Sequence, residues 1–79
     1  MLTFEQRLQN VFQEVFEDDD LEVTDDLSSK TLETWDSFAQ VKLIVGLEEE
    51  FDVKFTTDEV ATLSSAVQLK QALHAKGID

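Results

Sequence analysis

Apolar residues recur at every third or fourth position in two long stretches of the chain, and this spacing places them on one face of an α-helix. The first stretch covers about residues 3–17 and begins with Thr3 and Gln6, a pair that forms a capping box at a helix start. The second covers residues 37–51, and we expect its broad apolar stripe to face the core: Phe38, Val41, Ile44, Val45, Leu47 and Phe51. Its one glycine, Gly46, indicates either close packing against a neighbour or tolerance by a well-supported helix, and we favour close packing.

Two shorter helices are expected in the last third of the chain. Val53 and Phe55 alternate with polar residues in a short extended link, and a brief helix should follow as far as Leu63. A last helix should end at Lys76-Gly77, where a cation and a glycine suit a helix C-terminus. Each helix is preceded by hydroxyl residues that can cap it: Thr56 or Thr57 for the third, and Ser64 or Ser65 for the last.

Residues 18–34 lose this periodicity and collect six acidic residues between Asp18 and Asp26. Their apolar residues are spread through the segment and should pin a long, ordered crossover to the core: Leu21, Val23, Leu27 and Leu32. The acidic positions resemble a calcium loop in composition only, because the turn glycine is missing and Ser29 stands where a bidentate Glu belongs. The sequence predicts an all-α, small four-helix bundle with a long first loop and a short third helix.

Size and charge restrict the possible partners. The 79 residues suffice for one domain, residues 1–79, and carry 18 acidic against six basic side chains, for a net charge of −12. This charge disfavours nucleic acid and anionic membranes and favours basic protein surfaces and a monomeric state. The chain has no cysteine, which excludes disulfides, thiolate zinc sites and a catalytic thiol of its own.

The start of the chain lacks the features of a targeting or membrane segment. No basic region or long apolar run follows Met1, so we expect neither a signal peptide nor membrane insertion, and we expect a cytoplasmic protein. The lone His74 cannot form a metal cluster.

Ser37 stands at the predicted start of the second long helix, where unpaired backbone amides and the positive end of the helix dipole suit a phosphate ester. Ser37 with Gln40 also satisfies a capping box, so a simple capping role is the alternative. Asp36 can cap equally well, which would leave the Ser37 hydroxyl free. A catalytic serine has little support, because the only histidine lies near the far end of the last helix.

The pattern as a whole resembles the acyl carrier proteins, small acidic four-helix bundles that hold growing chains on a phosphopantetheine arm. Asp36-Ser37-Phe38 resembles the family's Asp-Ser-Leu attachment motif, and the segment Leu47–Phe51 follows at the usual distance. The resemblance implies that a phosphopantetheinyl transferase attaches 4'-phosphopantetheine covalently to Ser37. It also implies a non-enzymatic protein that presents thioester-bound acyl groups to loading and processing enzymes with basic docking surfaces.

The resemblance further implies a docking role for Glu48 and Glu49, with Phe38 and Val45 as apolar contacts, although an acidic run alone would indicate only a solvated face. The chain departs from the family pattern where fatty-acid carriers commonly place acids, at Ala39 and Lys42. Lys42 should weaken docking to enzymes of housekeeping fatty-acid synthesis and so indicates a specialised pathway.

Trp35, before the Asp-Ser pair, is a third departure. We expect it to pack in the core against Leu32 or Phe38, and a direct role in recognising a partner or the arm is the alternative.

The core could shelter part of a short acyl chain, and we expect its lining to include Phe12, Phe16, Phe38, Ile44, Val45, Leu47, Phe51, Phe55 and Leu63. Two alternatives to an acyl carrier stay open. One is an aminoacyl carrier, of the D-alanyl or peptidyl type. The other is a non-carrier acidic scaffold that binds a basic helix or surface, in which Ser37 would be only a cap.

Overall fold

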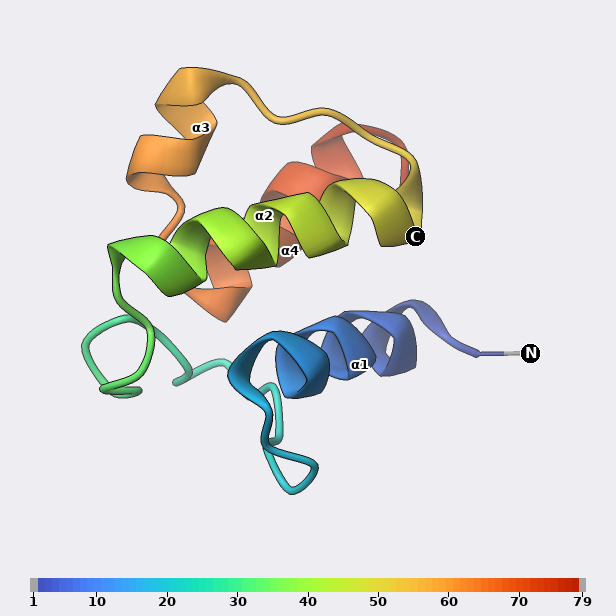
Figure 1. Cartoon of the computed structure of the whole chain (residues 1–79). Coiled ribbons are helices and arrows are strands. Elements are labelled where there is room, and N and C mark those ends of the chain that lie inside the picture. Colours follow the sequence, from blue (N-terminus) through green and yellow to red (C-terminus); the bar gives the residue numbers. More distant parts are fainter. Residues whose placement is uncertain (1, 79) are drawn as a thin grey trace.

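The computed structural model describes residues 2–78, which form four helices: α1 (Phe4–Phe16), α2 (Ser37–Phe51), α3 (Thr57–Thr62) and α4 (Ala66–Ala75). α1 and α2 pack against each other and run in opposite directions, and α4 lies behind α2 in the view of Figure 1. The short α3 stands near the end at which α2 begins (Figure 1). No β-strand occurs within residues 2–78, so the all-α prediction is confirmed.

The helix starts follow the predicted capping residues. The Thr3 hydroxyl accepts a hydrogen bond from the Gln6 amide, and the Gln6 side chain accepts one from the Thr3 backbone. Thr56 makes the same reciprocal pair at α3, and Ser65 caps α4. Gly77 adopts a φ of +90° just after α4, a conformation that favours glycine. These local signals determine where each helix begins and where α4 ends.

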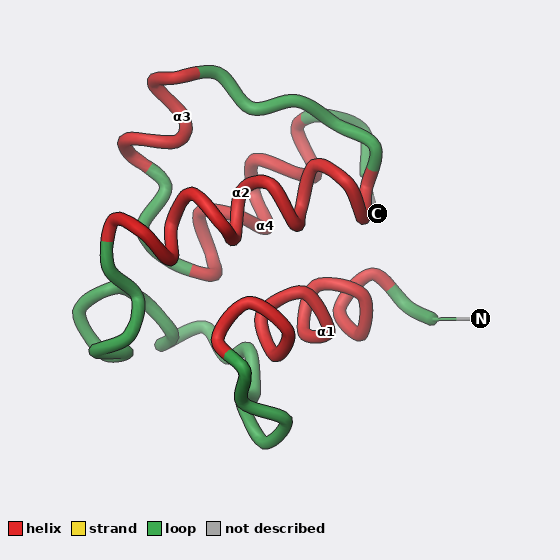
Figure 2. Tube along the Cα trace, in the orientation of Figure 1, coloured by secondary structure: helices red, strands yellow, loops and turns green. Residues whose placement is uncertain are grey.

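The long loop between α1 and α2 is ordered, as predicted, but it is not a crossover between distant helix ends: it stays at the end of the bundle where α1 ends and α2 begins (Figure 2). Leu27 is buried, and three other apolar residues of the loop pack against the core: Leu21, Val23 and Leu32. An isolated antiparallel bridge joins Ser28 to Ser65, with the Ala66 amide donating to the Leu27 carbonyl at 2.9 Å. The loop is thereby fastened to the start of α4.

The core forms between α1, α2 and α4, and it corrects one sequence prediction. Phe38, Val41 and Val45 of α2 are 74%, 55% and 47% exposed, so the placement of these residues in the inward stripe was wrong. Leu43, which was not predicted, is fully buried in their place, and Ala39 is buried beside it. Apolar residues lie on almost every side of α2, but α1 and α4 cover only part of its circumference.

The other predicted lining residues do belong to the core or pack against it: Phe12, Phe16, Ile44, Leu47, Phe51, Phe55 and Leu63. Gly46 lies where α1 packs against α2, as expected. A Cβ atom at this position would stand 3.0 Å from Val11 Cγ1 and 3.6 Å from Val15 Cγ2. The glycine allows the two helices to approach each other.

Candidate functional site

Ser37 is the first residue of α2, and its side chain is exposed. Asp36 is the N-cap, with its carboxylate accepting a hydrogen bond from the Ala39 amide at 2.9 Å. The Gln40 side chain bonds to other groups and not to Ser37. The alternative in which Ser37 is the cap is therefore wrong, and its hydroxyl does not serve the helix start.

A cleft of about 570 Å³ opens beside Ser37. Ser29 and Ser64 line it from the loops, Ser37 and Gln40 line it from α2, and Val60 lines it from α3. Its lining thus combines hydroxyl and amide groups with apolar side chains. A group attached to Ser37 has this cleft within reach.

Trp35 lines the inner side of the cleft, just before α2 begins. Its indole is only 4% exposed, and its ring centroid lies 5.5 Å from that of Phe12, edge to face, and 6.0 Å from that of Phe16. The prediction that Trp35 belongs to the core is confirmed, although the aromatic residues against which it packs come from α1, and Phe38 is largely exposed. Its indole N–H donates to Gln40 Oε1 at 2.7 Å.

Gln40 joins three parts of the structure, a role that the sequence analysis missed because it considered Gln40 only as a capping partner of Ser37. Its amide nitrogen donates to the carbonyl of Val60 at 2.9 Å and to that of Leu63 at 2.6 Å, while its oxygen accepts from Trp35. The two carbonyls lie near the C-terminus of α3, where helix carbonyls lack partners within the helix. The only signal in the sequence was a polar residue within an apolar helix.

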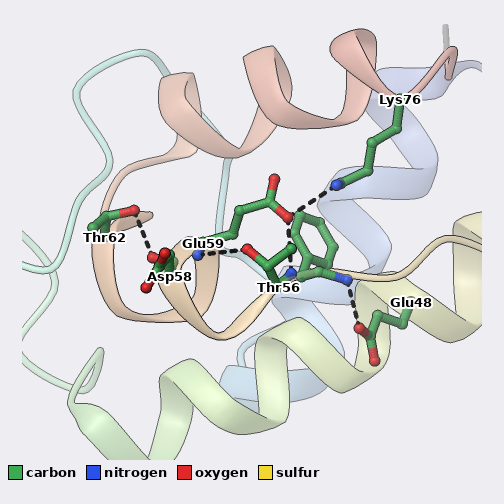
Figure 3. A network of polar contacts seen from close by, with 7 residues as sticks. Glu48, Thr56, Asp58, Glu59, Thr62 and Lys76 are labelled. Atoms are coloured by element: carbon green, nitrogen blue, oxygen red, sulfur yellow. Dashed lines mark hydrogen bonds and ion pairs between the residues drawn. The ribbon is translucent and has the colours of Figure 1, made fainter.

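The other side of α3 is held by a polar network (Figure 3). Glu59 accepts hydrogen bonds from the Thr56 amide at 2.8 Å and from Lys76 Nζ at 3.0 Å. The bond from the Thr56 backbone, followed by the bond from Lys76, holds the pKa of Glu59 below its ordinary value of 4.5. Glu48 of α2 accepts a bond from the Phe55 amide at 2.8 Å, which fixes the link that leads into α3.

The residues expected to dock partners do not all share one environment. Phe38, Lys42, Val45 and Glu49 are exposed, and their spacing places them on one side of α2. Lys42 Nζ lies 5.3 Å from the centre of the Phe38 ring, within the range of a cation–π contact. Glu48 is half-buried, and its carboxylate is engaged with the Phe55 amide.

Within residues 2–78, no group of three or more His, Cys, Asp or Glu side chains is placed to hold a metal ion. No helix of the described residues is long and apolar enough to cross a membrane.

The sequence pattern of the family described as "phosphopantetheine attachment site" matches residues 6–73, which run from α1 into α4. The chain belongs to this family. The domain of this family is that of the acyl carrier proteins, and this domain carries covalently attached 4'-phosphopantetheine. The chain is therefore a phosphopantetheine carrier protein. This result favours the carrier role over the alternative of a non-carrier scaffold. Comparisons with curated proteins and with solved structures gave no match.

Membership of the family implies that a phosphopantetheinyl transferase and processing enzymes act on this carrier protein. The residues around Ser37 are compatible with the cofactor. The Ser37 hydroxyl is exposed and does not cap the helix. It lies at the start of the 15-residue α2 and borders an open cleft.

Proposed function

We propose that Ser37 carries the phosphopantetheine arm and that the protein presents acyl groups, bound to this arm as thioesters, to enzymes of a specialised pathway. The observation that supports this assignment is the exposure of Ser37 at the first position of α2 while Asp36 serves as the cap. The amides of Ser37 and Phe38 have no carbonyl partner within the helix, and the helix dipole is positive at this end. Both features favour a phosphodiester at Ser37.

Bound to Ser37, the arm supplies the terminal thiol that forms the thioester, which the cysteine-free chain cannot provide. The contribution of the protein is to hold the attachment point at a rigid helix start. Tethering also gives the cargo a high effective concentration at each enzyme that docks. We further propose that residues 1–79 act as a single carrier domain, since α1, α2, α4 and the long loop share one core.

We propose that partner enzymes dock on the α2 surface, which we define as Phe38, Val41, Lys42, Val45 and Glu49. Three apolar side chains are exposed here although most apolar residues of α2 are buried, and such patches often mark protein contacts. The net charge of −12 steers enzymes with basic surfaces toward the carrier.

Two residues on α2 modify this docking proposal. Glu48 contributes less to docking than Glu49, because its carboxylate would have to break its hydrogen bond from the Phe55 amide to bind a partner. Lys42 brings a cation into the middle of the α2 surface. We propose that it favours dedicated partners over the enzymes of housekeeping fatty-acid synthesis, which meet acids at this position in other carriers.

An aminoacyl group is the second candidate cargo. Hydroxyl groups of Ser29 and Ser64 line the cleft that borders Ser37. Such groups can pair with an ammonium or amide on the cargo, which a purely aliphatic chain cannot use.

The attachment is tested by intact-protein mass spectrometry after incubation with coenzyme A and a phosphopantetheinyl transferase of broad specificity. We expect the wild type to gain one phosphopantetheine-sized increment and Ser37→Ala to gain none. Ser29→Ala is the matched control, because Ser29 is also exposed and lines the same cleft. An increment on Ser37→Ala, or its loss in Ser29→Ala alone, would contradict the assignment.

A further inference from the structure

Gln40 lies one helical turn after Ser37 on α2, and it holds α3 against this end of the helix. Its side-chain amide uses both of its polar atoms, the oxygen toward Trp35 and the nitrogen toward the carbonyls of Val60 and Leu63. Gln40 is half-buried, so these bonds are partly shielded from water. One side chain thus joins the corner before α2, α2 itself and the end of α3.

α3 buries little of its own surface. None of its six residues is buried, and it is the shortest of the four helices in the described part of the chain. Val60 and Leu63 are only partly buried where they pack against the core. On the opposite side, Glu59 pairs with Lys76 of the α4 end. Among residues 2–78, the Gln40 bonds are the hydrogen bonds that join α2 to the end of α3 beside Ser37.

The neighbouring core is closed to solvent. Leu43 and Leu69 are fully buried, and Trp35 and Ile44 are 4% exposed. The free volume beside Ser37 lies outside this core, in the cleft lined by Gln40 and the loop serines. A chain that starts at Ser37 could enter the core between α2 and α3 only if α3 moved away from Gln40.

We propose that Gln40, fixed in place by Trp35, is a latch that determines which cargo this carrier accepts. This inference rests on the proposed attachment at Ser37. The latch holds α3 against α2, so the thioester-bound group stays in the cleft beside Ser37 and does not enter the core. A long aliphatic chain then gains no burial in the core. The site therefore suits short or polar acyl groups, whose polar atoms can use the lining of the cleft.

The test loads the intact protein from acetyl-coenzyme A or octanoyl-coenzyme A with a transferase, and intact mass confirms each product. A failure to load would refute the attachment at Ser37 and not the latch. The melting temperature of each loaded form is then compared with that of the form carrying the arm alone. A chain that is buried in the folded state raises the melting temperature, whereas one that stays in solvent does not.

In the wild type, we expect the acetyl and octanoyl forms to have the same melting temperature as the form that carries the arm alone. In Gln40→Ala, we expect the octanoyl form alone to melt higher, by about 4 °C or more. Gln13→Ala is the matched control, since the Gln13 amide also donates to a backbone carbonyl, that of Leu21, at 3.0 Å but far from α3. We expect its melting temperature to fall without any dependence on cargo.

The latch is refuted if octanoyl stabilises the wild type as much as Gln40→Ala, or if it stabilises neither protein. Should Gln40→Ala not fold, Trp35→Phe decides, because it keeps a buried aromatic ring and removes the N–H donor that fixes Gln40. A smaller octanoyl-specific rise in Trp35→Phe would support the latch, and no rise would overturn it.

Discussion

Replacing Gly46 with alanine sets helix propensity against packing, and the structure indicates which effect dominates. Alanine in a helix interior is favoured over glycine by about 1 kcal/mol. The new Cβ would stand 3.0 Å from Val11 Cγ1, whereas carbon atoms pack best at about 3.5 to 4.0 Å. The distance between the new Cβ and Val11 Cγ1 would thus be shorter than the lower end of this optimum by roughly 0.5 Å.

The strain is not easily relieved, because Val11 is buried and its β-branched side chain has one strongly preferred rotamer in a helix. α1 must therefore move away from α2, and overpacking of this kind costs about 1 to 3 kcal/mol. We expect Gly46→Ala to lower the free energy of unfolding by about 1 kcal/mol net. If Val11 is first replaced by alanine, the clash disappears, and the same change at Gly46 should stabilise by up to about 1 kcal/mol.

Urea denaturation of the wild type, both single variants and the double variant gives the coupling free energy directly. We expect a coupling of about 2 kcal/mol between the two positions. A fold of this size is stable by only about 4 to 12 kcal/mol, so effects of this magnitude are measurable. If Gly46→Ala stabilises the wild type and the Val11→Ala variant equally, the argument from close packing is refuted.

Two further predictions concern α3 and the α2 surface. The lowered pKa of Glu59 means that its bonds add stability above about pH 4.5, which is lost as the pH falls through the lowered pKa. Glu59→Gln should therefore destabilise the protein near neutral pH, and this loss should shrink as the pH falls below about 4.5 through the lowered pKa of Glu59. A loss of unfolding free energy in urea that stays constant as the pH is lowered would contradict this. Lys42→Glu should raise kcat/KM for loading by a generic fatty-acid synthase partner about tenfold at low salt, more than Lys42→Ala does; no gain would count against the docking proposal.

The features that could be predicted from the sequence are those determined by neighbouring residues. Capping depends on groups three residues apart, so Thr3, Asp36 and Thr56 could be identified as candidate caps from the chain alone. The ordered loop was also predictable, because apolar residues spaced through an acidic segment must be buried somewhere.

The features that could not be predicted depend on how the helices surround one another. α2 is apolar on nearly every side, so its sequence does not indicate that Leu43 is buried while Phe38 and Val45 are exposed. Gln40 gave no clear signal, because its bonds reach carbonyls of residues 20 and 23 positions away. The engagement of Glu48 with the Phe55 amide likewise follows from the path of the chain after α2.

The central claim is that the phosphopantetheine arm is bound to Ser37, and fragmentation mass spectrometry of the unmutated protein tests it most directly. The protein is produced with a transferase and digested, and the modified peptide is fragmented to locate the added group. We predict that the group lies on Ser37 and is lost together with its phosphate during fragmentation. Location of the group on any other hydroxyl, such as Ser29 or Ser64 beside the same cleft, would contradict the account.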